Sequence, residues 1–379
     1  MLKKICFQHY KAFEEKNSMT IKPITVILGK NSSGKSSLCK LIASMAKAVT
    51  PDEENLIPMK VGKVVLGSTY EDLFHNGVTT ELSLGLVFED HISIDISYIM
   101  QMGELYVHQY SLTHGNNVKR SLFKTIKESL DSGIHGVIKS DSFSSMGIPI
   151  KATQFSVDYI GPIRVYDKRL IQKNDINSSS YVGYDGFYAY EMLLDSFLKE
   201  TELLRQVSEW FKLNMDGQSL EIVEQGLGSG NYCLNVKRGN AHVNIADVGV
   251  GLTQVLPVIV QSFVPKADIT IIEQPSLHLN PAAHASVAER LALSAKENNK
   301  SYVIETHSET FLLALKKLIA DPSTYFSRDD LALYYVDHNE EEATLHPIEI
   351  MDNWEYSFWP TGLFEDDFNL MTDIDRLRL

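Results

Sequence analysis

The sequence predicts an α/β fold: a core built on a mixed sheet, with an antiparallel β subdomain and a helical insertion beside it. Three observations predict it. A strand, a glycine-rich turn and a helix follow one another near the N-terminus, and two further apolar strands in the C-terminal half each end in an acid. Short β-type runs alternate with turns between residues 50 and 115.

The strand–turn–helix unit carries a phosphate-binding pattern. Residues Gly29 to Ser36 fit G-x-x-x-x-G-K-[ST] at every fixed position. The run before them, 24–28, is apolar and β-branched, and the apolar residues after them recur at helical spacing. Such a turn exposes backbone N–H groups at the positive end of a helix dipole, which binds phosphate. The sequence therefore predicts a site for a nucleoside triphosphate.

The residues of this loop have separate expected roles. Lys35 would reach the β- and γ-phosphates, and the hydroxyl of Ser36 would hold Mg²⁺. The residues expected to contact the nucleotide are Gly29, Lys30, Asn31, Ser32, Ser33, Gly34, Lys35, Ser36 and Ser37.

The bulk composition is that of an ordinary globular chain. At 379 residues it could form two domains, or one large core with insertions. No apolar run approaches the roughly eighteen residues that span a bilayer, and polar residues interrupt the N-terminus. The cysteines, Cys6, Cys39 and Cys233, are too few and too far apart to predict disulfides or a zinc site. We therefore expect a cytoplasmic protein with no membrane segment.

The net charge of −14 bears on nucleic-acid binding. Duplex-binding proteins usually carry a basic surplus, because neutralising phosphates supplies non-specific affinity. Here the surplus is acidic, and the small basic clusters Lys119–Arg120 and Lys168–Arg169 fit solvated loop charges. DNA as a partner therefore has weak support.

Two apolar strands predicted at 269–272 and 302–304 end in polar residues. A helix predicted from 281 to about 299, capped by Asn280, connects them, so the strands should be parallel. Ligands of open α/β sheets lie at the carboxyl ends of the strands. The residues placed at this edge, beside the phosphate loop, are Glu273, Gln274 and His307.

Each edge residue has an expected role and a plainer alternative. Glu273 would hold Mg²⁺, or it is a surface acid. His307 would sense the γ-phosphate or position the attacking water, or it makes a structural hydrogen bond. His278, in the turn after the first strand, is expected to be structural.

A second glycine-containing segment, Asp247 to Gln254, leads into an apolar helical stretch. Two glycines spaced by one residue at a helix N-terminus can bind an anion, although G-x-G also occurs as a plain turn. Its place about twenty residues before Glu273 gives this segment weight.

Taken in order, the phosphate loop, the glycine segment, the strand–acid–x–Pro string and the strand-end histidine resemble a known family. They resemble the ABC-type ATPase heads of the SMC and RecF group, and more closely the OLD-like AAA-family ATPases of prokaryotic defence loci. The matching phrases are residues 24–37, 159–164, 247–257, 272–281 and 305–308, and residues 359–364 resemble the tail of one branch. The resemblance implies a P-loop NTPase fold with an ABC-type head.

The resemblance also implies an assembly. Such heads dimerise head to tail and trap two ATP molecules between the phosphate loop of one protomer and the signature segment of the other. Gly249, Gly251 and Thr253 would then contact the γ-phosphate held by the partner. The usual Ser-Gly-Gly string is absent, and Asp247 or Val248 stands where its serine would fall. ATP and Mg²⁺ are the implied cofactors.

Two more residues have open roles under this resemblance. Arg164 would touch phosphate or the partner subunit, or form a structural ion pair. Phe13, near the first strand, is a candidate for stacking on the adenine.

One departure from the family changes the expected mechanism. In ABC-type heads the residue after the Mg²⁺-supporting acid is usually a glutamate that polarises the attacking water, and here it is Gln274. An amide can orient water, as in some GTPases, but it cannot accept the proton. General-base help typically contributes ~10²–10⁴-fold. We therefore expect slow hydrolysis and a long-lived ATP-bound dimer, unless Glu305 or Asp247 serves as a substitute base.

The sequence predicts four parts. An N-terminal ATPase lobe spans 1–115, a helical and mixed insertion 116–235, a C-terminal ATPase lobe 236–350 and a tail 351–379. In the insertion, 186–214 has the longest helical signal, with a stripe that faces the core or a partner. The chain has no heptad run for an SMC-type coiled coil. Only about seventy residues follow His307, so any nuclease is expected on a separate polypeptide.

Three functions remain open on the sequence. The first is a nucleotide-gated regulator that holds or releases a nuclease or toxin in antiphage defence. The second is a RecF-like repair ATPase that acts on DNA directly, and the third is a small-molecule phosphotransferase. The acidic charge favours the first over the second, and the signature segment and Glu-Gln-Pro string favour both over the third.

Overall fold

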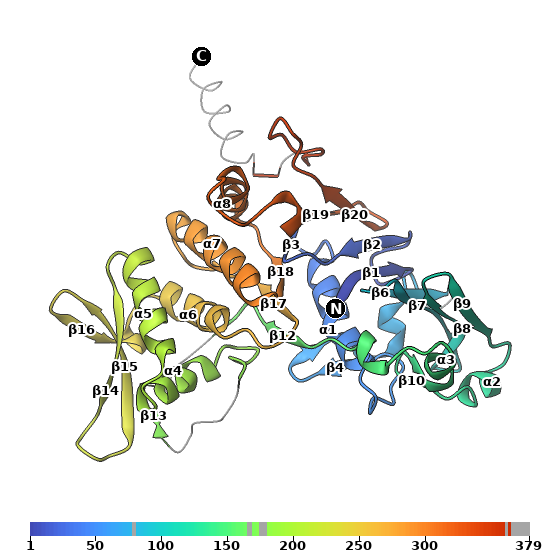
Figure 1. Ribbon diagram of the computed structural model, residues 1–379, viewed down its shortest axis with the longest axis horizontal. Coiled ribbons are helices and arrows are strands. Elements are labelled where there is room, and N and C mark those ends of the chain that lie inside the picture. Colours follow the sequence, from blue (N-terminus) through green and yellow to red (C-terminus); the bar gives the residue numbers. More distant parts are fainter. Residues whose placement is uncertain (78–80, 165–168, 174–179, 361–362, 365–379) are drawn as a thin grey trace.

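The computed structural model of the protein describes residues 1–77, 81–164, 169–173, 180–360 and 363–364 (Figure 1). A six-stranded mixed sheet forms its centre, with five parallel strands and one antiparallel edge strand. In spatial order these are β12 (Val157–Ile160), β17 (Ile269–Glu273), β18 (Ser301–Glu305), β3 (Ile24–Gly29), β19 (Leu331–His338) and β20 (Ala343–Ile348). The expected parallel arrangement of the strands that end in Glu273 and Glu305 is confirmed.

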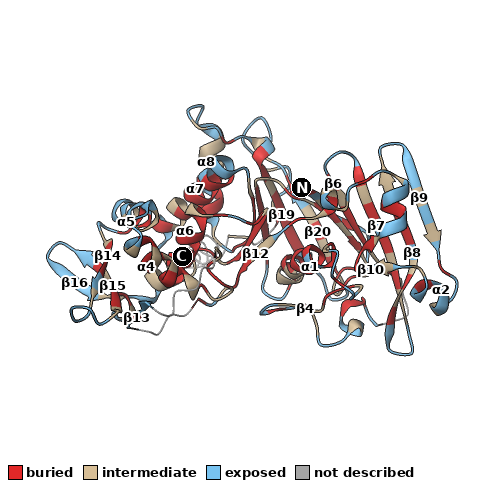
Figure 2. Ribbon diagram, turned by 60° about the horizontal axis from the view of Figure 1, so that its bottom comes forward, coloured by how far each residue is buried: buried red, intermediate tan, exposed pale blue. Residues whose placement is uncertain are grey.

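Side chains of the central strands enter two separate cores, because successive residues of a strand point to opposite faces of the sheet. On one face Ile27 and Ile271 pack with α1 (Lys35–Ala48) and the antiparallel sheet. On the other face Val26 and Ile272 pack with the remaining large helices. Figure 2 shows these central strands and α1 as buried. The phosphate loop connects β3 to α1 and so lies at the carboxyl edge of the sheet.

The predicted antiparallel sheet is confirmed and is larger than the sequence indicated. It has six strands: β2 (Asn17–Thr20), β1 (Leu2–Gln8), β6 (Leu82–Phe88), β7 (Ile92–Gln101), β8 (Glu104–His114) and β9 (Asn117–Leu122). The pairing of β1 with β6 joins segments about eighty residues apart, which a local pattern does not reveal. Shorter elements follow β3 and β9: β4 (Lys60–Val61), β5 (Val64–Val65), α2 (Ile126–Leu130), β10 (Ile134–His135), β11 (Ile138–Lys139) and α3 (Ser140–Ser145).

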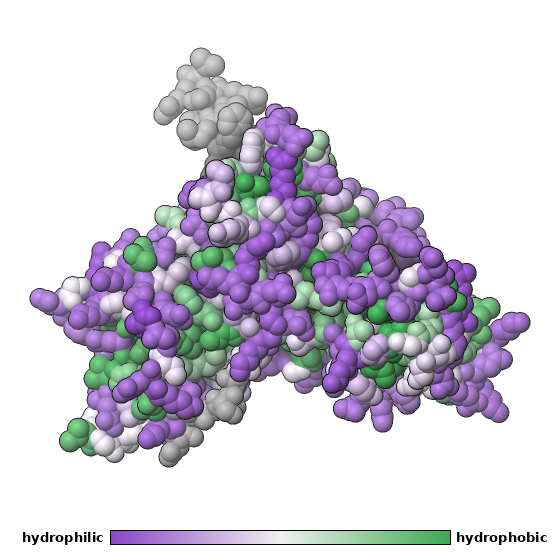
Figure 3. All heavy atoms as spheres, in the orientation of Figure 1, coloured by the Kyte–Doolittle hydropathy of each residue, from purple (hydrophilic) through white to green (hydrophobic). Residues whose placement is uncertain are grey.

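The other end of the molecule, at the left in Figure 1, combines helices with a small sheet. The helices are α4 (Tyr188–Leu198), α5 (Glu202–Asn214) and α6 (Val250–Phe263), and α7 (Pro281–Asn298) and α8 (Glu309–Ala320) continue this layer toward the central sheet. The small sheet has β13 (Ile171–Gln172), β15 (Asn231–Arg238) and β14 (Ser219–Glu224), with β16 (Ala241–Asn244) paired to β15. Hydrophilic side chains cover most of the face in Figure 3, and hydrophobic groups show between them.

Two local predictions are corrected. The helical signal over 186–214 forms two helices rather than one, because the chain turns at Glu200, whose φ is +54°. The Ser196 hydroxyl accepts a hydrogen bond from the Leu204 amide and stabilises this turn. The stripe does face the core, where Leu193 and Val207 are fully buried. The sequence also gave no sign that residues 157–160 form the edge strand β12.

Parts of two predicted segments lie outside the described residues. Of the proposed tail 351–379, residues 361–362 and 365–379 lie outside the described residues, as does Lys168 of the second basic cluster. Within the described part of the chain, the structure has no helix long and apolar enough to traverse a lipid bilayer.

The half-buried carboxyl group of Asp158 predicts a pH-dependent stability. It lies on β12, accepts a hydrogen bond from Gln261 Nε2 of α6 at 3.1 Å, and burial raises its pKa to about 6. Because the folded pKa exceeds the unfolded one, its contribution is complete below about pH 4 and is lost as the pH rises to about 6.

We expect Asp158→Asn to remove this dependence of the unfolding free energy on pH. In urea unfolding, the stability of the variant relative to the native chain should rise by about 2–3 kcal/mol between pH 4 and pH 7. Asp216→Asn, at an exposed turn, is the control. Parallel stability curves for the native chain and Asp158→Asn would contradict the assignment.

Candidate functional site

The phosphate loop has the conformation that its sequence predicts. Gly29 and Gly34 have φ angles of +148° and +108°, in the region that favours glycine. A Cβ at Gly29 would lie 2.5 Å from the carbonyl oxygen of Val336, so no larger residue fits there without a shift. The loop surrounds a cavity of about 360 Å³, lined by Asn31, Ser32, Ser33, Gly34, Lys35, Ser36, Ser37 and Glu305.

The ring of Phe13 has a different place from the one expected. It is fully buried, and a Cβ on Gly34 would touch it at 3.2 Å. It also packs edge-on against Phe7, with ring centroids 5.0 Å apart. Phe13 therefore supports the loop from below and has no free face on which a base could stack.

The hydrogen-bond donors of the loop suit a bound triphosphate. Lys35 Nζ donates to the carbonyl oxygens of Gly29 and Lys30 at 2.9 and 2.6 Å, and burial lowers the pKa of this ammonium. The Ser33 hydroxyl oxygen is buried and has no hydrogen-bond partner among the described residues. Unpaired buried polar atoms are costly, so a ligand that accepts from this hydroxyl would stabilise the loop. Lys35 and the loop amides would hold the phosphates.

Two carboxylates lie side by side at the edge of the sheet. Glu273 and Glu305 are register partners on β17 and β18. The Ser36 hydroxyl donates to Glu305 Oε2 at 2.7 Å, whereas Glu273 accepts from the hydroxyl of Tyr159. Burial raises the pKa of both carboxyl groups. The sequence placed Glu273 with Ser36, and the structure adds Glu305 as the acid in direct contact with that hydroxyl.

These groups have the chemistry of a magnesium site. Mg²⁺ is usually held by one or two carboxylates together with substrate phosphates and water. Ser36, Glu273 and Glu305 would supply its protein oxygens, and the bound ion would neutralise charge on the phosphates. The described residues contain no cluster of three or more His, Cys, Asp or Glu side chains that could bind a metal by themselves.

Gln274 is held by its backbone in an unusual conformation. Its φ is +49°, in the left-handed region that costs a non-glycine residue free energy. The backbone N–H of Gln274 donates to the carbonyl oxygen of Glu305 at 2.8 Å, and the backbone carbonyl of Gln274 accepts from Arg164 Nη2 at 2.7 Å. Both bonds direct the chain after β17 toward the end of β18, beside the phosphate loop.

Within the described chain, Arg164 forms no hydrogen bond with a residue of the phosphate loop or with a carboxylate. Its side chain is 1% exposed, and its guanidinium donates to four carbonyl oxygens. These belong to Gly161, Gln254, Glu273 and Gln274. The Gln254 side chain in turn bonds to the backbone of Arg164 at both its amide and its carbonyl. Of the roles expected for Arg164, the structural one is closest, with carbonyls in place of an acid.

This arrangement makes Arg164 a fixed link between α6 and the end of β17. Burial lowers its pKa to about 10, so the guanidinium is still charged at neutral pH. Its planar fork satisfies several carbonyls at once, which a lysine cannot do. The sequence signal was available, since Arg164 ends a matching phrase, but its partners are about 90 and 110 residues away.

His307 lies two residues after β18 and is exposed. Partial desolvation, and then the charge of Lys35, lower the pKa of its imidazole. His307 therefore lies close enough to Lys35 to feel its charge. His284, which the sequence did not single out, contacts the residue after His307: its Nδ1 is 2.7 Å from Oγ of Ser308, the N-cap of α8.

The glycine segment lies on a different part of the molecule. Gly249 caps α6, which packs in the core on the face of the sheet opposite α1. Gly249 has no neighbour within 4 Å of an added Cβ, while a Cβ on Gly251 would lie 2.6 Å from the His278 carbonyl oxygen. The Thr253 hydroxyl donates to the Val250 carbonyl oxygen within the helix. Among the described residues, the exposed Gly249 end of the segment therefore has room for an added side chain.

Asp247 does not lie at the predicted edge as a free base. Its carboxylate forms a two-pronged ion pair with Arg169, at 2.5 and 2.6 Å, on the surface before α6. Glu305 is therefore the acid that remains close to Ser36, and the expectation that Asp247 could replace a catalytic glutamate is not supported by its position.

Solved structures with this fold are heads of SMC proteins. One is described as the SmcHead bound to the C-winged helix domain of ScpA: 17% identity, covering 93% of this chain and 98% of that one, TM-score 0.55. Another is the Smc head domain with an extended coiled coil bound to the C-terminal domain of ScpA derived from Pyrococcus furiosus, at 15% identity, covering 100% and 99%, TM-score 0.50. The chain therefore shares the P-loop NTPase fold of these ATPase heads.

The family follows from the sequence match. The model described as "AAA domain, putative AbiEii toxin, Type IV TA system" matches residues 24–314, which is more than half of the chain. The protein therefore belongs to this family and carries an ATPase-type AAA domain. The search of curated proteins found no significant match.

The Arg164 link predicts a separation of binding from turnover. In Arg164→Lys the charge remains, but several of the four carbonyls lose their donor, so Gln274 should lose its fixed position. We expect ATP turnover to fall about tenfold with nucleotide affinity changed less than about twofold. Single-turnover kinetics and binding of a non-hydrolysable analogue measure the two effects.

Arg290→Lys is the matched control, because Arg290 is 8% exposed and bonds Ser262 and Glu297 away from this site. Equal losses of turnover in both variants would show that Arg164 acts on general stability alone.

Proposed function

We propose that the protein binds Mg·ATP, closes into a head-to-tail homodimer around it, and acts as a nucleotide-gated regulator of a separate nuclease or toxin. The observation that carries this proposal is the separation of two half-sites. The phosphate loop lies at the edge of the sheet beside α1, and the glycine segment caps a helix in the opposite core. A second copy of the chain would supply the missing half.

The contacts at the loop support ATP binding with Mg²⁺. In this proposal residues 29–37 hold the phosphates, and Ser36 with Glu273 and Glu305 holds the ion. His307, close to Lys35, contacts the γ-phosphate or orients the attacking water. Gln274 then orients that water through its amide rather than accepting its proton.

The exposure of the glycine segment supports a contact in trans. Gly249 and Val250 are exposed, Val250 at 57%, at the N-terminus of a helix of 14 residues. Backbone N–H groups at such an end attract anions. Gly249 and Thr253 are then placed for the partner's γ-phosphate, while Gly251 is small because the 276–279 turn packs closely against it.

The family description supports the link to a toxin, since it names an AbiEii toxin and a Type IV TA system. An effector on another polypeptide and a place in antiphage defence are part of this proposal and rest on the resemblance to the defence ATPases. A RecF-like role on DNA is the second candidate, favoured by the SMC-type fold. The net charge of −14 disfavours it, and an ATP-dependent gel shift at physiological salt would decide between the two.

Gly249→Asp tests the dimer. A Cβ at this position meets none of the described residues within 4 Å, so the fold should be unaffected, but the added charge would repel the partner's phosphate. We expect the native chain to become a dimer with a non-hydrolysable ATP analogue and Mg²⁺, and the variant to bind nucleotide yet stay a monomer. Light scattering after size exclusion reports both states.

Val243→Asp, which adds the same charge at an exposed position of β16, is the control for this experiment. A Gly249→Asp protein that dimerises as the native chain does would remove the glycine segment from the interface.

Gln274→Glu tests the slow chemistry. A carboxylate at this position could accept the proton that the amide cannot, so we expect steady-state ATP turnover to rise about tenfold or more. Gln225→Glu makes the same chemical change in an exposed loop and should have no effect. A native turnover above a few per second that the Gln274 change leaves unaltered would rule out the idea.

A further inference from the structure

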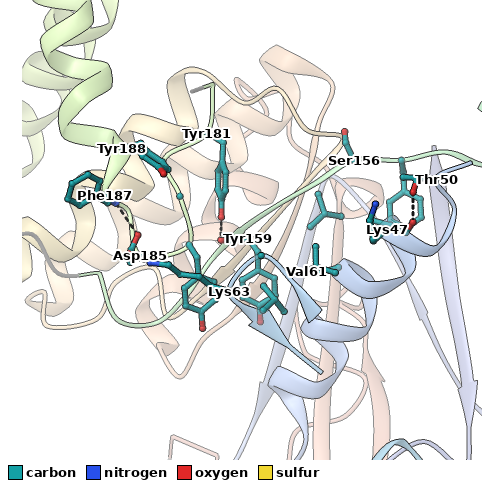
Figure 4. Close-up of a pocket in the computed structure, with 18 residues that line it drawn as sticks. Lys47, Thr50, Val61, Lys63, Ser156, Tyr159, Tyr181, Asp185, Phe187 and Tyr188 are labelled. Carbon is teal, nitrogen blue, oxygen red and sulfur yellow. Dashed lines mark hydrogen bonds and ion pairs between the residues drawn. The ribbon is translucent and has the colours of Figure 1, made fainter. Parts of the chain in front are cut away.

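A second cavity, of about 650 Å³, lies beside the edge strand β12 (Figure 4). Its walls come from the C-terminal half of α1, the β4–β5 hairpin, residues 155–159 and residues 181–188. Its lining residues and those of the phosphate-loop cavity do not overlap. Its volume is within the range of small-molecule sites, so it is a candidate for a separate ligand.

The lining favours a flat apolar ligand. Ala43 and Ala46 of α1 form a floor without long side chains, and both are buried. Six aromatic side chains complete the walls: Phe155, Tyr159, Tyr181, Tyr184, Phe187 and Tyr188. Aromatic rings offer stacking faces and edges to a planar group.

The charges at the rim favour an anion. Lys47 and Lys63 line the cavity with one acid, Asp185, and Lys47 also pairs with Glu53 outside the lining at 3.4 Å. Lys47 is 45% exposed, so its ammonium can also reach an anion in the cavity. Figure 4 shows Lys63 extending from the hairpin to Asp185, where the ion pair measures 2.6 Å. The lysine side chain is 65% exposed, and exposed pairs are weak, so Lys63 can exchange this partner for a ligand.

We propose that this cavity is a second ligand site, which binds a small planar aromatic anion of nucleotide size and communicates with Glu273 through Tyr159. The stacking surfaces and the floor hold the planar group, and Lys47 and Lys63 bind the anionic group.

Tyr159 connects the cavity to the carboxyl edge of the central sheet, because its ring and its hydroxyl make contacts in different places. Its ring lines the cavity and stacks on Tyr184 at 5.7 Å, while its hydroxyl donates to the Glu273 carboxylate. The wall segment is also bonded to β12, since Gly161 N donates to the Tyr184 carbonyl oxygen at 2.7 Å and the Tyr181 hydroxyl donates to the Tyr159 carbonyl oxygen. A ligand that displaces Tyr184 or Tyr159 would therefore alter the hydrogen bond to Glu273.

The wall segment 181–188 also contacts α6. The Val182 amide donates to Gln261 Oε1 at 3.0 Å, and a Cβ on Gly186 would lie 2.3 Å from Pro257. Occupancy of the cavity is thus coupled by contact to the helix that carries the glycine segment. The communication rests on the proposed ATPase function, whereas binding in the cavity does not.

Binding is tested with the fluorescent aromatic anion 8-anilinonaphthalene-1-sulfonate on the full chain, with a non-hydrolysable ATP analogue and Mg²⁺ saturating the phosphate loop. We expect one site per chain, weakened about tenfold by Lys63→Glu and displaced by AMP. Lys60→Glu, on the same hairpin and outside the cavity lining, should change the affinity less than about twofold. Equal effects of the two lysine changes, or a probe that AMP does not displace, would overturn the site.

A variant whose side chain fills the cavity tests the same site in a second way. Ala46→Trp places a large ring on the floor and should abolish probe binding if the variant keeps the native circular dichroism and unfolding midpoint. If that variant fails to fold, the Lys63→Glu and Lys60→Glu comparison still decides the outcome, because both lysines are exposed.

The link through Tyr159 is tested by turnover at saturating ATP. We expect AMP to change the turnover of the native chain about threefold or more, and to have no effect on Tyr159→Phe, which keeps the ring and loses the hydroxyl. Tyr188→Phe removes a hydroxyl from the same cavity and should keep the response. A response that survives in Tyr159→Phe overturns the link, while an absence of ATPase activity in every protein overturns the proposed function and leaves the probe result standing.

Discussion

The parallel register of β17, β18 and β3 is the constraint on which the site depends. It sets Glu273 opposite Glu305, and Glu305 opposite Ile27, so two carboxylates end beside the start of the phosphate loop. Burial raises the pKa of both, which means that ionising them together is unfavourable in the protein alone. A divalent cation removes that cost, so nucleotide and metal are expected to bind as a unit. A slip of one residue in either strand would separate the carboxylates and reverse every side chain between the two cores.

The sequence predicted what depends on local pattern. The loop, the helix capped by Asn280, the strands that end at Glu273 and Glu305, and the antiparallel runs after residue 81 all have signals within a dozen residues. The edge strand β12 was missed because four residues of mixed character carry no periodicity. The pairing of Ser36 with Glu305, 269 residues away, depends on register that no local signal contains.

The same distinction explains the corrected residues. Arg164 was expected to touch phosphate or the partner subunit, or to form a structural ion pair, and its bonds to carbonyl oxygens require Gln254 and the end of β17 in place. Phe13 was assigned to the ligand from its nearness in sequence to the first strand, but the glycine at position 34 allows its ring to fill the space under the loop. Asp247 has a partner, Arg169, that lies 78 residues earlier in the chain. Long-range packing decided each of these cases.

Two neighbouring residues receive contacts from opposite directions, and this bears on whether the protein works as a switch or a motor. Glu273 is bonded to Tyr159, whose ring lines the second cavity, and Gln274 is bonded to Arg164, which is fixed to the helix of the glycine segment. A fast motor needs a general base that turns over independently of such contacts. Here the residue expected at that position is Gln274, whose side-chain amide cannot accept a proton and whose backbone is held in the left-handed region. Slow chemistry at this position would keep the nucleotide-bound state long enough for both contacts to influence how it ends.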